Sequence, residues 1–283
     1  MAVYSEKDSL EKLGLSQNNF EELKPYIYIR LFNKENLPFD YNIEDVPHKK
    51  ILDCAMTYCV QEKVYIDCEK GVNCYLIKNT DIEKWGISVS ELHELAYKNT
   101  RENNNARIET LQKHISRYHV LSPINELPKT VGFSCDVSPT NPKIVRHSLF
   151  ENAQYGTMPI QTNINLARFI KDDSEEKEID NLLIISNRTM NFGAVNMFFS
   201  DVTDKVHDIF EEDFYMIPLS IHEALCVRKS FANRDSDSFK EAEEDLLEMI
   251  EQINDHVLSK TFDILSYNIY LHLHEDRCNF MIK

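Results

Sequence analysis

Two side chains that could perform acyl transfer lie two residues apart in the segment 214–226. Ser220 and His222 would project to the same side of an extended chain. A serine hydroxyl becomes a nucleophile when an imidazole accepts its proton, provided that a carboxylate orients the imidazole and an oxyanion hole is present. His48, which follows a proline in a polar segment, could add a base or a ligand. The pattern therefore indicates a candidate hydrolase site made of His48, Ser220 and His222.

A structural role for the same residues competes with this interpretation. The runs Phe214–Ile217 and Ala224–Arg228 have the aromatic and aliphatic content of buried strands, and Pro218 interrupts the ladder between them because it has no N–H to donate. Serine and histidine at such a corner commonly hydrogen-bond to the backbone of the turn. Glu223 would point to the opposite side of the chain, and His48 could simply anchor its loop. We expect a corner held by hydrogen bonds, with the hydrolase as the alternative.

Two histidines near the C-terminus are candidate metal ligands. His272 and His274 would share one face of a strand, and two imidazoles so placed can hold a transition metal. Glu275 and Asp276 could complete the coordination only if the chain turned back. The four cysteines within residues 54–74 are spaced by five, nine and six residues, unlike the closely spaced pairs of zinc ribbons. We therefore expect no cofactor and no metal.

The cysteine pattern indicates the redox compartment. Seven cysteines occur, at positions 54, 59, 68, 74, 135, 226 and 278. The count is odd, no pair has C-x-x-C spacing, and several lie in apolar surroundings, which is typical of reduced thiols inside the cell. The N-terminus lacks the basic and apolar regions of a secretion signal, and no apolar run approaches the roughly 18 residues of a membrane span. The sequence predicts a cytoplasmic protein with free cysteines.

Negative charge is concentrated in the C-terminal part of the chain. The formal net charge is −16, and residues 201–276 hold 19 Asp and Glu against 6 Lys and Arg. Such a field repels nucleic acid and anionic membranes and attracts basic partners. The helix predicted from Ser238 to Val257 tolerates like charges at i, i+4, which mildly destabilise helices. Its candidate partner-binding residues are Glu241, Glu244, Asp245, Glu248, Glu251 and Asp255. The alternative is a solvated face without a partner.

The scarcity of glycine excludes familiar classes of enzyme. Only six glycines occur, against an average usage of roughly 7%. Neither G-x-G-x-x-G nor G-x-x-x-x-G-K-[ST] is present, so the glycine-rich loops that cradle phosphates are missing. The nucleophile elbow G-x-S-x-G is also absent. These absences count against a nucleotide-hydrolysing enzyme and against the hydrolase interpretation.

Mixed strands and helices without regular β-α-β spacing predict an α+β fold. A strand at 26–32 precedes a hairpin of 51–60 and 72–77 around Gly71, and helices follow at about 80–85 and 89–99. These elements form a first hairpin-plus-helix unit. We expect antiparallel sheets with helices packed on one face.

A second, similar unit is predicted nearer the C-terminus. Residues 182–186 and 194–199 read as a hairpin, and Asp201 would cap a helix through about 212. The helix from Ser238 and a last strand at about 266–274 complete it. We therefore divide the chain into an N-terminal unit (1–118), a proline-rich insertion with a charged linker (119–180) and an acidic C-terminal unit (181–283).

Five blocks of the sequence resemble a known pattern in the same order: Leu23–Asn33, Asp45–Asp53, Asn79–Ala96, Ile185–Ala194 and Phe214–Leu225. They are similar to an uncharacterised family of Gram-positive bacterial proteins, known only as a domain of unknown function. Members read approximately "RLIN…DVPHRRFLDLA…LWGITEEELYELA…LTNKKGIYGAA…FYILPSSIHEVIL". The chain departs from this pattern at Leu219 and in the stretch 119–160, which members mostly lack. The resemblance implies no activity, cofactor or catalytic residue, but the frequent placement of such genes in mobile elements suggests host–element conflict or regulation.

The sequence thus favours a cytoplasmic binding or regulatory protein without catalysis. Its acidic C-terminal surface would engage a protein partner with a basic surface. One version is an antagonist of a nucleic-acid-binding machine, encoded by a mobile element, whose carboxylates imitate a phosphate backbone. Direct binding to nucleic acid or membrane is not expected, because the net charge is strongly negative.

Overall fold

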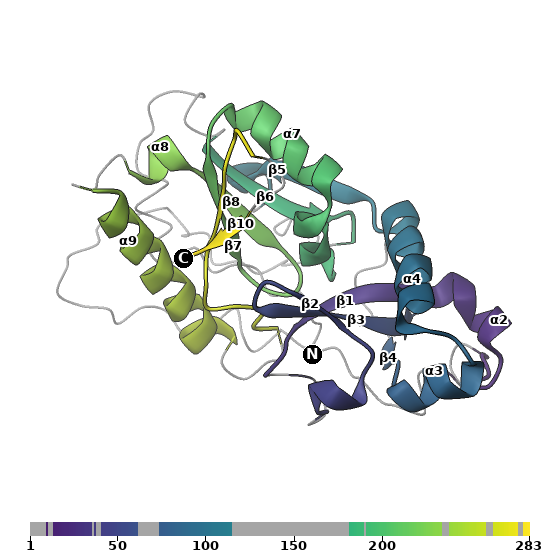
Figure 1. Ribbon diagram of the computed structural model, residues 1–283. Helices are drawn as coiled ribbons and strands as arrows, with labels where there is room; N and C mark the ends of the chain where they lie inside the picture. The colour runs from purple at the N-terminus through teal and green to yellow at the C-terminus, as the bar shows by residue number, and fades with distance from the viewer. Residues whose placement is uncertain are drawn as a thin grey trace, which may run out of the picture.

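Two antiparallel sheets and the helices packed on them form the fold (Figure 1). The computed structural model describes residues 10, 14–35, 37, 41–61, 74–114, 181–189, 191–233, 238–258, 263–276 and 280–283. The proline-rich insertion and charged linker predicted for 119–180 lie outside these residues.

The first sheet is centred on a long antiparallel pair, β1 (Ile27–Asn33) and β3 (Cys54–Gln61). On the other edge of β3, β2 (Lys49–Ile51) pairs with its start and β4 (Cys74–Leu76) with its end. The antiparallel pairing of β3 with β4 confirms that the two predicted strands pair, while the predicted turn at Gly71 lies outside the described residues. Every residue of β3 is buried, which explains its nearly continuous run of apolar and small side chains.

Helices and turns beside this sheet are α2 (Phe20–Leu23), η1 (Lys24–Tyr26), η3 (Ile43–Asp45), α3 (Asn79–Trp85) and α4 (Val89–Asn103). The start of α4 is fixed locally. The Ser88 hydroxyl accepts a hydrogen bond from the Glu91 N–H, while the Glu91 carboxylate accepts one from the Ser88 N–H. This reciprocal cap satisfies two donors that the first helical turn leaves without partners.

Helix α4 also completes the open edge of β1. The Thr100 hydroxyl accepts from the Ile29 N–H at 2.9 Å, and the Asn99 amide donates to the Ile27 carbonyl at 2.9 Å. An edge strand otherwise exposes unpaired backbone groups to other chains. Two polar side chains of the helix therefore supply hydrogen bonds to the β1 backbone that a neighbouring strand would otherwise supply.

The second sheet has six strands in the order β10-β9-β7-β8-β6-β5, all antiparallel. In chain order they are β5 (Ala106–Thr110), β6 (Leu182–Asn187), β7 (Phe214–Pro218), β8 (Ala224–Arg228), β9 (Tyr270–His272) and β10 (Phe280–Ile282). The two strands predicted on either side of the proline corner are confirmed as the pair β7 and β8.

Alternate residues of the second sheet enter two different cores. Leu183, Met216 and their neighbours on one face pack with α7 (Ser200–Phe210) and the first sheet. Ile184, Ile217 and their neighbours on the other face pack on α9 (Phe239–Gln252). Figure 1 shows the sheet between α7 and α9. The predicted α+β class with antiparallel sheets is confirmed, but helices cover both faces of this sheet because both faces are apolar.

The second predicted hairpin is wrong. Residues Gly193–Phe198 form a 3-10 helix, η5, rather than a strand. Strand β6 has no free edge for them, since β5 pairs with one side and β8 with the other. Strands β5 and β10 were not predicted. Other differences are at element ends, since α7 begins at Ser200 and the last predicted strand is regular only in β9.

Strand β5 connects the two predicted units. It belongs in sequence to the N-terminal unit 1–118, yet it pairs along its length with β6 of the C-terminal unit. One hydrophobic core also contains Ile29 of β1 together with Met216 of β7. The division into the units 1–118, 119–180 and 181–283 therefore stays a prediction.

The described cysteines, Cys54, Cys59, Cys74 and Cys226, are free and buried. This agrees with the prediction of free thiols, while Cys68, Cys135 and Cys278 lie outside the described residues. Within the described part of the chain, no helix combines the length and apolarity that crossing a membrane requires.

Candidate functional site

The proline corner between β7 and β8 is a closed turn. The carbonyl of Glu223 accepts hydrogen bonds from the backbone N–H groups of Leu219 and Ser220, at 3.1 and 3.2 Å. Pro218 stands opposite Ala224 in the last pair of the ladder, where its missing N–H costs little. All residues of the turn are buried. The corner is therefore a packed structural element rather than an open cleft.

Ser220 and His222 lie together but do not form a nucleophile and its base. The Ser220 hydroxyl accepts a hydrogen bond from the backbone N–H of His222 at 3.0 Å. The imidazole Nδ1 accepts from the Phe192 N–H at 3.0 Å, so Nδ1 is unprotonated and Nε2 carries the proton. Nε2 lies 3.6 Å from a carboxylate oxygen of Asp263. Both ring nitrogens thus face groups other than the hydroxyl, as the structural interpretation expects.

His48 does not join this pair through any hydrogen bond of the described residues. Its Nδ1 lies 3.0 Å from the carbonyl oxygen of Val46, two residues earlier in the same loop. This is a loop-anchoring contact of the kind expected under the structural interpretation. The geometry therefore gives no support to a hydrolase site of His48, Ser220 and His222.

The imidazole of His222 holds a second turn, which runs from Asn187 to Gly193. The amide of Asn187 donates to the carbonyl of Asn191 and accepts from its N–H, at 2.6 and 3.1 Å. Phe192 takes a left-handed backbone conformation with φ of 55°. Gly193 then lies against backbone on three sides, and a Cβ there would be 2.6 Å from the Asn187 nitrogen and 2.7 Å from the His222 carbonyl oxygen.

Substituting Gly193 should disturb this junction. We expect Gly193→Ala to lower the free energy of unfolding by about 1–3 kcal/mol, because an added methyl group forces backbone to move in a packed core. Chemical denaturation measures the change. Gly86→Ala is the matched control, since nothing lies within 4 Å of its added Cβ and only its left-handed φ of 66° opposes the change. A Gly193 variant no less stable than the Gly86 variant would contradict the packing argument.

A buried charge cluster behind the corner was not predicted. His114 lies four residues after β5, and its two ring nitrogens are 3.1 Å from a Glu109 carboxylate oxygen and 2.6 Å from one of Glu223. All three residues are buried. Burial alone would lower the pKa of His114, but hydrogen bonds and charge from Glu223 and then Glu109 outweigh it and raise the pKa. The sequence signal was slight, because Glu223 and His114 are 109 positions apart.

The candidate metal ligands gather with a third imidazole. His272 is buried in β9 and stacks on Phe214, with 4.6 Å between ring centroids. The ring of His207 from α7 lies 5.5 Å from that of His272 and 5.6 Å from that of His274. Burial and the nearby His207 lower the pKa of His272 to about 3. Across the described residues no group of three or more His, Cys, Asp or Glu is arranged to hold a metal ion.

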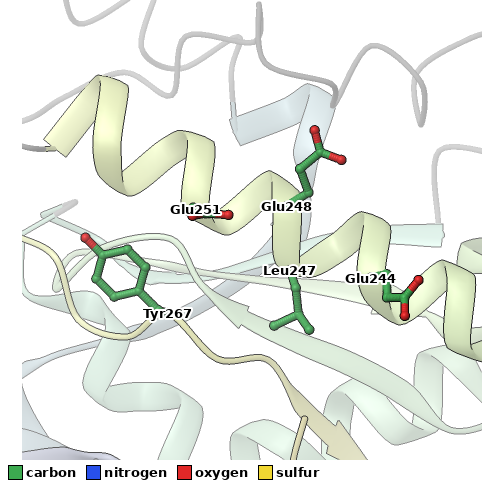
Figure 2. Close-up of a pocket in the computed structure, with 5 residues that line it drawn as sticks. All are labelled: Glu244, Leu247, Glu248, Glu251 and Tyr267. Atoms are coloured by element: carbon green, nitrogen blue, oxygen red, sulfur yellow. The ribbon is translucent and has the colours of Figure 1, made fainter.

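The acidic helix α9 forms one wall of an open groove (Figure 2). Ser238 caps the helix as predicted, its hydroxyl accepting from the Glu241 N–H. The groove is lined from α9 by Glu244, Leu247, Glu248 and Glu251, which follow each other on one helical face, and from the opposite segment by Tyr267. Tyr267 is 45% exposed, and Leu247 is half-buried.

The six predicted partner-binding residues differ in position. Three of them, Glu244, Glu248 and Glu251, line the groove. Asp255 accepts a hydrogen bond from the Tyr267 hydroxyl at 3.2 Å. Glu241 is exposed in the first turn of α9, and Asp245 is half-buried. The sequence pattern missed Leu247 and Tyr267, because neither is charged and Tyr267 comes from another segment.

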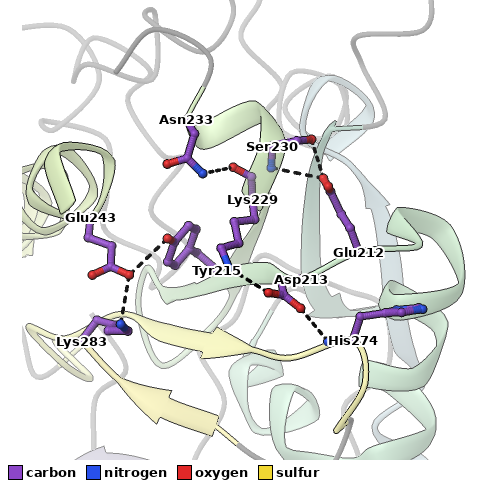
Figure 3. Close-up of polar contacts among 9 residues, drawn as sticks. All are labelled: Glu212, Asp213, Tyr215, Lys229, Ser230, Asn233, Glu243, His274 and Lys283. Atoms are coloured by element: carbon purple, nitrogen blue, oxygen red, sulfur yellow. Dashed lines mark hydrogen bonds and ion pairs between the residues drawn. The ribbon is translucent and has the colours of Figure 1, made fainter. Parts of the chain in front are cut away.

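Near its start, α9 is attached to the second sheet by polar contacts of Glu243 (Figure 3). A Glu243 carboxylate oxygen accepts from the Tyr215 hydroxyl and pairs with the Lys283 ammonium, both at 3.2 Å. Close by, the Asp213 carboxylate pairs with Lys229 at 2.8 Å and accepts from the His274 N–H at 2.9 Å. The Glu243 contacts hold the start of α9 against the sheet, one helical turn before the groove residue Leu247 on the same side of the helix. The Asp213 contacts involve no residue of α9.

Comparisons with known proteins identify the chain only at the level of family. No curated protein and no solved structure shows a significant match. A family model matches residues 1–273, which include the corner, the buried charge cluster and the groove. The resemblance to an uncharacterised family is thereby confirmed. The chain belongs to the family of unknown function DUF5688.

Proposed function

We propose that this protein is a non-catalytic cytoplasmic binding or regulatory protein that engages a basic segment of another protein. The groove beside α9 carries the proposal, since it combines three carboxylates with an exposed tyrosine ring and a leucine side chain. Lysine and arginine have the same mixed character, because an apolar stem ends in a cation. The groove thus matches a basic side chain in both charge and apolar character.

Each contact in such a complex would be modest. A cation over the face of Tyr267 is worth about 0.5–1 kcal/mol at an exposed site. A solvent-exposed ion pair with Glu244, Glu248 or Glu251 contributes about 0–1 kcal/mol. The negative charges around the groove would raise the association rate more than the affinity, because charges at the rim of an interface steer the encounter of the two proteins. A partner with several basic residues in sequence would gain from all of these contacts together.

A basic protein that itself binds nucleic acid fits this surface. The carboxylates would occupy a cleft that otherwise holds phosphates, which makes an antagonist of a nucleic-acid-binding machine a specific form of the proposal. Encoding by a mobile element is part of the same proposal. The rival proposal, a hydrolase at His48, Ser220 and His222, is weakened by the geometry of the corner, where both ring nitrogens of His222 face other groups.

Charge reversal in the groove tests the proposal. The triple variant Glu244→Lys, Glu248→Lys and Glu251→Lys should bind a hexa-arginine peptide at least about tenfold more weakly, since three favourable pairs worth up to about 1 kcal/mol each become repulsive. Titration calorimetry measures the affinity. The fold should persist, because these three side chains are exposed.

A matched control distinguishes the loss of groove contacts from the effect of a change in net charge. Glu83→Lys, Glu94→Lys and Glu102→Lys change the net charge equally at exposed positions of α3 and α4. Raising salt from about 0.05 to about 0.5 M should weaken the unmodified protein's binding, as the Debye length shrinks toward a few ångströms. Equal losses in the two triple variants would show that the groove is not the binding site.

A further inference from the structure

One face of the first sheet carries buried polar side chains. Tyr28 and Arg30 of β1 stand opposite Cys59 and Thr57 of β3, and Gln61 comes two positions after Cys59. Residues two apart on a strand share a face, so these side chains form one contiguous group. The side chains opposite the tyrosine and the arginine are short. Long polar groups of β1 are thus not covered by large side chains of β3.

Arg30 is a buried cation without a carboxylate. It is 3% exposed, its Nη1 donates to the Ile29 carbonyl at 3.0 Å, and its guanidinium lies 4.0 Å from the centre of the Phe192 ring. Its Nε–H has no hydrogen-bond acceptor, and among the described residues no acidic side chain forms an ion pair with it. This occurs in a chain of net charge −16, where carboxylates are plentiful. Buried charges are ordinarily paired.

Two further buried atoms on the same face have no partner. They are the hydroxyl of Tyr28 and the side-chain carbonyl oxygen of Gln61, on residues that are 3% and 5% exposed. Buried polar groups in native proteins are rarely left without a hydrogen bond. Three such groups on adjacent positions of two paired strands therefore mark a place where a partner is missing.

We propose that this face, hereafter the Arg30 face, binds a small oxyanion, either a phosphate or a carboxylate, through the Nε edge of Arg30. Arginine presents Nε and Nη2 in a fork that matches the spacing of carboxylate and phosphate oxygens. The Tyr28 hydroxyl supplies a second donor, and the Gln61 oxygen accepts from a hydroxyl or amino group of the same ligand. The ligand is thus a small anion that also carries a hydrogen-bond donor.

The surroundings suit an anion. Burial raises the pKa of Tyr28, despite the opposing charge of Arg30, so the hydroxyl keeps its proton and can donate. The thiolate form of Cys74 is an internal anion that could take the place of a ligand beside Arg30. Burial raises its pKa, but a hydrogen bond to Cys59 and the charge and hydrogen bond of Arg30 lower it. A thiolate at Cys74 would neutralise the guanidinium without any ligand, which makes it the alternative that the experiment must separate.

Binding of simple anions to the full chain tests the proposal. Titration calorimetry with sodium phosphate and with sodium malate, against sodium chloride at equal ionic strength, should show saturable binding of at least one of the first two. The two arms distinguish a phosphate from a carboxylate ligand. Arg30→Lys retains the charge but removes the Nε edge, so affinity should fall at least about tenfold.

Two further variants complete the test. Tyr28→Phe removes only the hydroxyl and should weaken binding severalfold, which keeps the proposal testable if the Arg30 variant does not fold. Arg188→Lys, at an exposed position, should bind as the unmodified protein does. The proposal is overturned if neither anion binds saturably, or if binding is equal in the unmodified protein and in the Arg30 and Tyr28 variants. If a Cys74 thiolate already neutralises Arg30, neither anion should bind saturably.

Discussion

Replacing His114 with alanine should lower the free energy of unfolding by about 3–5 kcal/mol, the usual cost of breaking a buried ion pair by removing one partner. The imidazolium lies between the carboxylates of Glu109 and Glu223, at 3.1 and 2.6 Å, and all three residues are buried. Without it, two carboxylates in one buried cluster lose the positive charge between them. Chemical denaturation at neutral pH measures the loss.

The pH dependence of the same variant gives an independent readout. Because the folded protein raises the pKa of His114, the stabilisation is fully present below the unfolded value of about 6.5 and is lost as the pH rises through the folded value. The stability of the unmodified protein should therefore decline on the alkaline side, and the His114→Ala curve should lack that decline. His93→Ala, at a half-buried histidine bonded to Tyr58, is the control. Parallel curves for the His114 variant and the unmodified protein would refute a charged His114.

Asp53→Asn should lower the free energy of unfolding by about 2–4 kcal/mol. Asp53 lies in the two-residue turn between β2 and β3, beside Leu52 with its left-handed φ of 53°. Its carboxylate accepts from the Ser266 hydroxyl at 2.5 Å, from the Asn268 amide at 2.8 Å and from the Tyr270 hydroxyl. Hydrogen bonds to a charged group contribute about 1.5–3 kcal/mol each, so a neutral amide loses much of this set.

These bonds join the two sheets, since the turn belongs to the first and Tyr270 begins β9 of the second. Burial raises the pKa of Asp53, but the hydrogen bonds from Ser266, Tyr270 and Asn268 outweigh it and lower the pKa. The stabilisation is thus present above the unfolded value of about 3.9 and is lost as the pH falls through the folded value.

The curves for Asp53→Asn and the unmodified protein should therefore converge in acid. Asp45→Asn, at an exposed acid in η3, is the matched control and should change stability by no more than about 0.5 kcal/mol. An Asp53 variant indistinguishable from this control would show that the contacts between the sheets contribute little.

Local features of the sequence were sufficient to predict several elements. Aromatic and aliphatic content predicted the strands β7 and β8, and the chemistry of proline predicted the break at Pro218. Helical periodicity and the capping serine predicted the helix from Ser238. These signals come from residues within a few positions of each other, and the backbone responds to them locally. The α+β class and the family were accessible for the same reason, because they depend on the order of such elements.

Contacts between distant parts of the chain were decided only by tertiary structure. Residues Gly193–Phe198 have the composition of a strand, but β5 and β8 occupy both edges of β6, so the segment forms a 3-10 helix. Tyr267 became a wall of the groove because another segment folds back beside α9. No local pattern encodes such an approach.

The buried charges illustrate the same limit. The sequence by itself determined that Arg30 occupies an apolar strand and that Glu223 stands at a corner. Only the folded chain places Phe192 against the guanidinium and His114 against the carboxylate, across 109 positions in the second case. Periodicity reports which face of an element is buried, whereas the partner on that face depends on how whole elements pack, and packing is a property of the complete chain.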